Sequence, residues 1–272
     1  MLSGEEFLQW CGRLSLSPEA QAVIAAIRSA GPTRRVEGGR ENVSGRYPSR
    51  KMGVTIQFES HRVELAFVYD MEHDPDVLEY FDQAPSIPLY YQSANERRLA
   101  VMHTPDYFVL HRASAGWQEC KHERELEKLE QKSPHRYCRD GTERWQCPPG
   151  DAYAARFGLY YRLRSSAEID WTLQRNIQYL DDYWRFNANG VASEIREIVA
   201  AEVSAAPGLR LSDLFRNTQG IASRDDVHRL IATGDTSLGR EPPCTDTNST
   251  DRPGSRGHVL CASTEMPARM PA

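Results

Sequence analysis

The sequence predicts an α/β fold in which a mixed β-sheet is flanked by helices and followed by a small helical domain. Two observations predict this fold class. Up to residue 165, short segments with alternating apolar residues are interspersed with segments of helical periodicity, and beyond it only helical periodicity recurs. We therefore expect a mixed-sheet domain over residues 1–165 and a helical domain over residues 166–240. Residues 241–272 are rich in Pro, Ser, Thr and Gly without apolar periodicity, which is typical of a disordered tail.

The composition limits the classes of function. The chain has 272 residues, of which 40% are hydrophobic, so it can bury a sizeable core. Its net charge is -5, so any contact with nucleic acid must come from a local basic patch. The six cysteines are scattered and are expected to be reduced thiols. The sequence starts without a signal-peptide pattern and contains no long apolar run, which predicts a soluble, cytoplasmic protein.

The first predicted helix begins with the capping residue Ser17 followed by Pro18, and it is expected to end at Gly31-Pro32. The next segment, up to residue 53, is rich in Arg, Gly and Ser. Such a segment is usually a solvated loop, although clustered Arg and Lys side chains also suit contacts with phosphates. The candidates for DNA contact are Arg35, Arg46, Arg50 and Lys51.

From residue 54 to residue 92 the pattern predicts a strand, a helix and two further strands. The strands are expected over residues 54–60, 77–85 and 86–92. The helix is expected over residues 61–73, with an apolar stripe that starts at Val63, and it ends at Asp74-Pro75. Glu64 would project beside this stripe, close to the sheet.

The runs PDYFVLH and GWQECK, joined by the short turn RASAG, predict a β-hairpin. Because side chains alternate across a sheet, Glu119 and Lys121 share one face and Cys120 points to the other. Asp106 begins the first strand and lies near the Glu119 face if the strands pair through the turn. Two carboxylates that lie close together repel each other, and a divalent cation relieves that repulsion. With a lysine to orient water or stabilise phosphate charge, the group predicts metal-assisted hydrolysis of a phosphodiester.

The alternative is that this Glu-x-Lys triplet is incidental. A second copy, Glu130-Gln131-Lys132, lies in a polar segment where opposite charges three and four residues apart merely stabilise a helix. The first copy differs because it closes an apolar strand and follows Pro105-Asp106 at hairpin distance.

The middle of the chain offers a second, competing site. His135, Cys138 and Cys147 suggest zinc, but a second Cys pair with matching spacing is absent, so a surface hairpin turning at Asp140-Gly141 is favoured. The run GLYYRLRS then predicts a strand that completes the core. Three histidines near the first site are interpreted as peripheral phosphate or solvent contacts: His103, His111 and His122.

The C-terminal third predicts helices. Ser165 and Glu168 resemble a capping box that opens the first of them. The helices are expected over residues 167–186, 191–205, 211–217 and 223–234. Short helices with a tight turn suit a helix-turn-helix or winged-helix module. The last helix carries two arginines but also Asp225 and Asp226, which makes protein contact at least as favourable as DNA contact.

Several motifs follow one another in a fixed order. They are Phe58-Glu59-Ser60, Val63-Glu64-Leu65, Asp74-Pro75-Asp76-Val77, Gln83-Ala84-Pro85, Thr104-Pro105-Asp106 and Glu119-Cys120-Lys121. The last two resemble the PD-(D/E)XK nuclease signature. The whole series is similar to the TnsA endonuclease subunit of heteromeric cut-and-paste transposases. The resemblance covers residues 40–165 and weakens afterwards.

This resemblance implies a restriction-endonuclease-like sheet and a set of site residues. Asp106 and Glu119 would be the main ligands of Mg²⁺, for which Mn²⁺ substitutes. The Cys120 backbone carbonyl would be an additional ligand, and Glu64 would reach the metal directly or through water. Lys121 would assist the attacking water. Family members sometimes have glutamine at the place of Glu119.

The resemblance also implies partners. In the family, this enzyme nicks the 5′ ends of the mobile element, so transposon-end DNA would be the substrate. An integrase-like transposase subunit cuts and joins the 3′ ends, and an ATP-dependent regulator protein controls both. The family's C-terminal domain contacts that regulator, whereas the unusual tail of this chain departs from the family pattern.

Two other functions remain open from the sequence. The first is a stand-alone restriction or repair nuclease with the same core. The second is a catalytically silent adaptor that binds DNA and partners, which the intact set of Glu64, Asp106, Glu119 and Lys121 argues against.

Overall fold

A computed structural model describes residues 1–32, 44–93, 95–185 and 190–233. The chain divides into two compact units, Met1–Ile169 and Asp170–Ala272, each of which is described here by itself. The predicted tail, residues 241–272, lies outside the described residues. Among the helices of the described ranges, none is long and apolar enough to cross a membrane.

The core of the first unit is a four-stranded sheet in the order β10-β7-β6-β3. Its strands are β3 (Val77–Asp82), β6 (Tyr107–His111), β7 (Ala115–Lys121) and β10 (Tyr160–Ser165). β10 runs parallel to β7, whereas β6 is antiparallel to both β7 and β3. The predicted mixed sheet is therefore confirmed.

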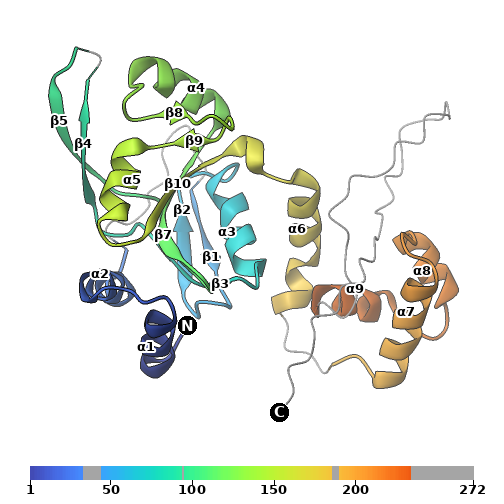
Figure 1. Cartoon of the computed structure of the whole chain (residues 1–272). Helices are drawn as coiled ribbons and strands as arrows, with labels where there is room; N and C mark the ends of the chain where they lie inside the picture. The colour runs from blue at the N-terminus through green and yellow to red at the C-terminus, as the bar shows by residue number, and fades with distance from the viewer. Residues whose placement is uncertain (33–43, 94, 186–189, 234–272) are drawn as a thin grey trace, which may run out of the picture. The chain divides into compact units, whose positions relative to one another are not determined.

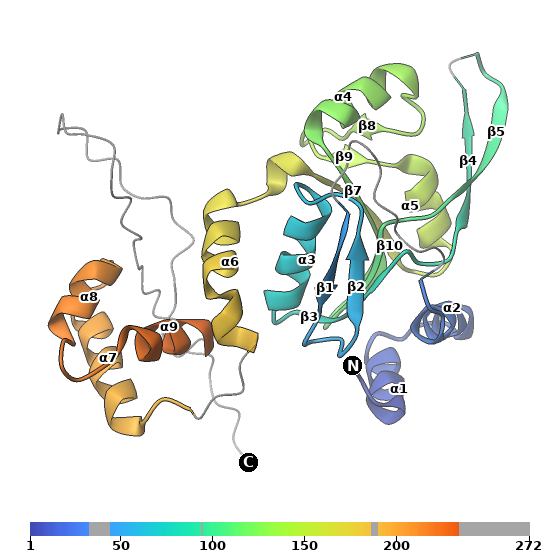
Figure 2. The ribbon, with the colours of Figure 1, turned by 180° about the vertical axis from the view of Figure 1, so that it is seen from behind.

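Helices cover both faces of this sheet. Figures 1 and 2 show α3 (Glu64–His73) and α5 (Pro148–Ala155) on opposite sides of it. The Trp117 ring of β7 packs against Tyr153 of α5, with 5.4 Å between ring centroids. The Arg164 guanidinium of β10 lies 3.9 Å from the centroid of Phe67 in α3. Because side chains alternate along β7, every second residue from Trp117 points to the α5 side.

Within the described residues, three two-stranded sheets accompany the central one. They are β1 (Gly45–Pro48) with β2 (Thr55–Phe58), β4 (Ile87–Gln92) with β5 (Arg98–His103), and β8 (Cys138–Arg139) with β9 (Trp145–Gln146). The strands expected near residues 54, 77 and 86 are present, and β8 and β9 form the hairpin expected around Asp140-Gly141. β1 corrects the prediction of a loop, because it lies inside the basic segment and pairs with β2.

Sequence reasoning missed three elements of this unit: α1 (Gly4–Arg13), β5 and α5. A signal for α1 was present, since Ser3 and Glu6 form a capping box. β5 was missed because its sequence, RLAVMH, does not alternate between apolar and polar residues. α5 begins with Pro-Pro-Gly, which reads as a turn unless the prolines occupy the first helical turn, as they do here. The predicted helices near residues 18, 64 and 123 are confirmed as α2 (Pro18–Ser29), α3 and α4 (Glu123–Lys132).

The second unit contains the four expected helices. They are α6 (Trp171–Arg185), α7 (Ser193–Ala205), α8 (Leu211–Asn217) and α9 (Arg224–Thr233). The Ser165–Glu168 capping box is present but caps a short 3₁₀ turn, Ser166–Glu168, rather than the long helix. Asp170 instead accepts hydrogen bonds from the N–H groups of Thr172 and Leu173 at the start of α6. A winged-helix fold stays a prediction.

α9, the proposed recognition helix, is largely used for packing. Its apolar residues from Val227 to Ala232 join the core of the helical unit. The Asp225 carboxylate accepts a hydrogen bond from the Tyr183 hydroxyl at 2.9 Å, and Asp226 accepts from the backbone N–H and hydroxyl of Ser223. Little of this helix is therefore free to enter a DNA groove.

A buried ion pair attaches the N-terminal helices to the sheet. Glu79 of β3 is 0% exposed, and its carboxylate accepts two hydrogen bonds from Arg28 of α2, at 2.8 and 3.0 Å. It also accepts the Leu2 N–H at 2.6 Å. This one carboxylate therefore joins α2 and the segment that leads into α1 to β3.

We expect Arg28→Ala to lower the free energy of unfolding by about 3–5 kcal/mol, because it leaves the Glu79 carboxylate buried without its cation. Urea denaturation measures the change. Arg13→Ala, at an exposed position, is the control and should change stability by less than about 0.5 kcal/mol. Equal effects of the two substitutions would contradict this role of Arg28.

Candidate active site

The β6–β7 pairing brings three of the predicted site residues together. Tyr107 pairs with Gln118, so Asp106, one residue earlier, lies beside Glu119. The Asp106 carboxylate accepts a hydrogen bond from the Cys120 N–H at 2.7 Å. The Lys121 ammonium lies 3.3 Å from a Glu119 carboxylate oxygen. The structure thus has the arrangement that the strand period predicts.

Glu64 approaches the same place from α3, where it is the first helical residue. Its side chain is buried, and its carboxylate accepts a hydrogen bond from the Glu59 N–H at 2.8 Å. Burial, together with the negative charge of Asp106, raises the pKa of Glu64 to about 8. The fourth predicted residue therefore lies within electrostatic range of the hairpin.

The charged form of Asp106 is also destabilised by its surroundings. Burial raises the pKa of Asp106 to about 6, and the negative charge of Glu119 adds to this effect, although Lys121 and the Cys120 N–H oppose it. The positive charge near Glu64 and Asp106 does not offset the free energy that is needed to ionise both buried carboxylates. The site consequently favours an added cation.

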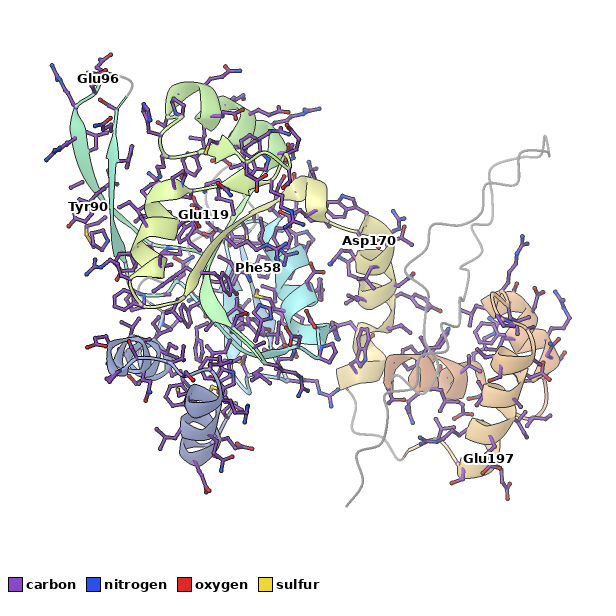
Figure 3. The ribbon with its side chains drawn as sticks, viewed as in Figure 1. Phe58, Tyr90, Glu96, Glu119, Asp170 and Glu197 are labelled. Carbon is purple, nitrogen blue, oxygen red and sulfur yellow. The ribbon has the colours of Figure 1, made fainter. Side chains whose placement is uncertain are left out.

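Glu119, labelled in Figure 3, differs because hydrogen-bond donors surround its carboxylate. Its side chain is 1% exposed and accepts hydrogen bonds from the hydroxyls of Tyr161, at 2.7 Å, and Tyr137, at 3.1 Å. His103 Nε2 lies 3.3 Å from the second carboxylate oxygen. Burial alone would raise the pKa of Glu119, but hydrogen bonding from His103 and the charge of Lys121 hold that pKa well below its ordinary value.

Sequence reasoning missed these three partners of Glu119. His103 was interpreted as peripheral, whereas it contacts both Glu119 and the Tyr161 hydroxyl, the latter at 2.9 Å. Tyr137 lies just before β8 and Tyr161 lies in β10, so neither is near Glu119 in sequence. Only the alternation of β10, which puts Tyr161 on the buried face, offered a sequence signal.

The donor chemistry fits a hard divalent cation at Asp106 and Glu64 better than at Glu119. Carboxylate oxygens are the ligands that Mg²⁺ prefers, and the raised pKa values of Asp106 and Glu64 mark negative charge that a cation would neutralise. Both Glu119 oxygens already accept hydrogen bonds. No three His, Cys, Asp or Glu side chains in the described part of the chain form a group that could hold a metal ion.

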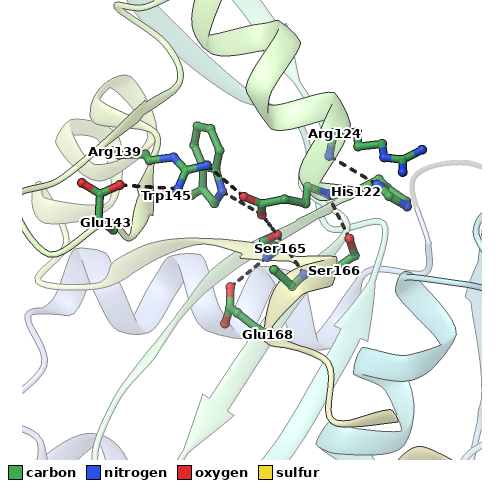
Figure 4. Close-up of polar contacts among 10 residues, drawn as sticks. His122, Arg124, Arg139, Glu143, Trp145, Ser165, Ser166 and Glu168 are labelled. Carbon is green, nitrogen blue, oxygen red and sulfur yellow. Dashed lines mark hydrogen bonds and ion pairs between the residues drawn. The ribbon is translucent and has the colours of Figure 1, made fainter.

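The residues just after Lys121 are held by a polar network (Figure 4). The Glu123 carboxylate accepts hydrogen bonds from Arg139 and from the Trp145 ring, each at 3.0 Å, and from the Ser165 hydroxyl. The Glu123 N–H donates to the Ser166 hydroxyl at 2.9 Å. These contacts tie the end of β7 to β9 and β10, so Lys121 projects from a fixed backbone.

The residues predicted to contact DNA differ in how exposed their side chains are. Arg46 and Arg50 are exposed, and Arg35 lies outside the described residues. The Lys51 ammonium donates to the carbonyls of Met71, Asp74 and Val77 at 2.6–2.8 Å. Lys51 thus caps the C-terminal end of α3, which corrects the expectation that its ammonium is available to a phosphate.

The cysteines of the alternative zinc site lie in the β8–β9 region. Cys147 is buried and Cys138 partly buried, and both are free thiols. Burial raises the pKa of Cys147 to about 12, so it behaves as a packed, neutral side chain.

Comparison of the chain with models of protein families and with curated proteins gives no match. The similarity to TnsA therefore remains a resemblance of ordered motifs. The interpretation of the site depends on the residues and contacts described above.

The raised pKa of Glu64 makes stability depend on pH. The folded protein keeps this proton between pH 4.5 and about 8, where the unfolded chain has lost it, so the free energy of unfolding falls as pH rises through this window. We expect Glu64→Gln, measured by urea denaturation without divalent cations, to be more stable than the parent at pH 8 by about 2 kcal/mol or more. At pH 4.5 the difference should nearly vanish, and a constant difference between the two pH values would contradict the assignment.

Proposed function

We propose that the protein is a metal-dependent DNA endonuclease subunit of a heteromeric transposase, cleaving the 5′ ends of a mobile element during excision. One observation carries the proposal. Asp106 and Glu64 lie beside the Glu119–Lys121 ion pair, and their negative charge is not fully balanced by nearby positive groups. These residues come together at the end of a hairpin in a mixed sheet. The order of the TnsA-like motifs supports a restriction-endonuclease-like core.

Each residue has a role that its environment suits. Asp106 and Glu64 would hold Mg²⁺ or Mn²⁺, with the Cys120 carbonyl as a further oxygen ligand. When bound, the metal ion supplies an activated water and neutralises charge on the phosphate. Lys121, whose charge is stabilised by Glu119 and Asp106 despite burial, orients the water or the phosphate. Glu119, a predicted ligand, is better suited in this arrangement to holding Lys121 in place.

The proposed partners are an integrase-like transposase subunit, which cuts the opposite strand, and an ATP-dependent regulator protein. The buried packing of α9 argues against DNA reading by this helix. A stand-alone nuclease differs in one measurable respect, because its nicking would not require the partner subunit.

We expect Asp106→Ala to reduce nicking of duplex DNA in Mg²⁺ or Mn²⁺, with the transposase subunit present, by at least about 10³-fold, since the variant loses a metal-binding carboxylate. Duplex binding, measured by fluorescence anisotropy, should change little. Glu130→Gln in the polar Glu130-Gln131-Lys132 copy is the matched control and should nick normally. Normal nicking by Asp106→Ala would exclude the assigned site.

Metal binding should also be visible without catalysis. Because protons compete with the cation for Glu64 and Asp106, Mg²⁺ should raise the melting temperature more at pH 8 than at pH 6. Scanning calorimetry with and without EDTA measures the shift, which Asp106→Asn should abolish. An Mg²⁺ effect that is the same in Asp106→Asn would place the cation elsewhere.

A further inference from the structure

The hairpin of β4 and β5 projects from the first unit. Its six residue pairs run from Ile87–His103 to Gln92–Arg98, and Figures 1 and 2 show both strands extending away from the central sheet. At the tip, the Ser93 N–H donates to the Arg97 carbonyl at 2.8 Å. We call residues 87–93 and 95–103 the arm.

The two faces of the arm differ in what covers them. Ile87 and Leu89 are buried, and β4 packs along α5 on this side. The opposite face carries Tyr90, labelled in Figure 3, and Met102. Their side chains are 66% and 65% exposed. Every other residue facing the same way is polar, small or a proline, and none is buried. Two large apolar side chains on a projecting ribbon indicate a contact surface.

The tip of the arm is basic. Arg97 and Arg98 are exposed, and their guanidinium groups have no ion-pair or hydrogen-bond partner within the described residues. Glu96 is the single acidic residue of the arm. In a chain of net charge -5, two free guanidinium groups at the end of a ribbon make a local positive feature that complements a phosphate backbone.

We propose that the arm is a DNA-contacting element. Arg97 and Arg98 bind phosphates, and Tyr90 and Met102 contact sugars and base edges in the groove. A two-stranded ribbon fits the major groove of B-DNA, and apolar side chains on such ribbons contact thymine methyl groups or bases. The inference rests on the proposed function for the identity of the ligand, a DNA duplex.

The base of the arm joins the candidate active site. His103, the last residue of β5, lies 3.3 Å from the Glu119 carboxylate. Arg98 is five residues away along the strand, which at about 3.3 Å per residue is roughly 17 Å. Along duplex DNA this distance is about five base pairs at 3.4 Å each. The arm would therefore contact phosphates about five base pairs from the nicked bond.

The test measures binding of the full chain, in the Asp106→Asn background, to a mixed-sequence duplex of about 30 base pairs by anisotropy at several salt concentrations. Loss of two phosphate contacts in Arg97→Ala/Arg98→Ala should reduce the salt slope by about 1.8, which weakens binding about 30-fold at 0.15 M salt. Tyr90→Ser/Met102→Ser should weaken binding several-fold with the slope unchanged, because neither residue is charged.

Matched controls separate these effects from general losses. Lys128→Ala/Lys132→Ala removes the same charge from α4, where neighbouring glutamates repel phosphates, and should leave the slope unchanged. Leu8→Ser replaces another exposed apolar residue, 63% exposed on α1, and should not weaken binding. Circular dichroism confirms that each variant is folded.

The outcomes distinguish the arm from the proposed function. Binding that depends on the arm, without any metal-dependent nicking by the parent chain, would support the arm and contradict the nuclease. Duplex binding that survives the arm substitutions with its salt slope unchanged, or no duplex binding even at low salt, would overturn the arm. Arm variants that change only the oligomeric state, measured by light scattering, would assign the exposed face to a second copy of the chain and also overturn it.

Discussion

The register between β6 and β7 is the constraint on which the candidate site depends. It sets Asp106 beside Glu119 and lets the Asp106 carboxylate accept the Cys120 N–H. Since the side-chain period of a strand is two, a slip of one residue would turn Glu119 and Lys121 to the α3 face and bring Cys120 to the α5 face. The short turn and the buried apolar residues of both strands oppose such a slip.

The carboxylates at this place are in different electrostatic states. Glu119 is stabilised in its charged form by two tyrosine hydroxyls, His103 and Lys121. Glu64 and Asp106 are buried near one another without comparable compensation, and this raises the pKa of each. A site that leaves part of its negative charge unneutralised resembles a cation-binding or proton-transfer site more than a structural ion pair. This asymmetry, more than the presence of four charged residues, supports the proposed chemistry.

Other charged side chains near the sheet serve the fold. Glu72 of α3 accepts hydrogen bonds from Ser49, from Tyr80 and from the N–H groups of Arg50 and Lys51, so it holds the turn between β1 and β2. The Lys51 ammonium in turn caps α3. These reciprocal contacts fix the helix that carries Glu64 at its first position. The described end of the basic segment, residues 49–51, is thus held by contacts within the protein itself.

The sequence by itself determined the alternation of β7, and with it the shared face of Glu119 and Lys121, because that period is local. It also determined α2 through its cap, α4 through the spacing of its charges, and α3 and the four C-terminal helices through apolar spacing. Tertiary structure decided what local patterns do not contain. Tyr161 and His103 meet at Glu119 because β10 pairs in parallel with β7 and because the arm returns to the sheet beside it. Tyr137 joins them from the segment before β8. The use of Lys51 as a cap and the burial of α9 were likewise decided by packing between elements, since a charged or amphipathic residue carries no local signal of which neighbour will cover it.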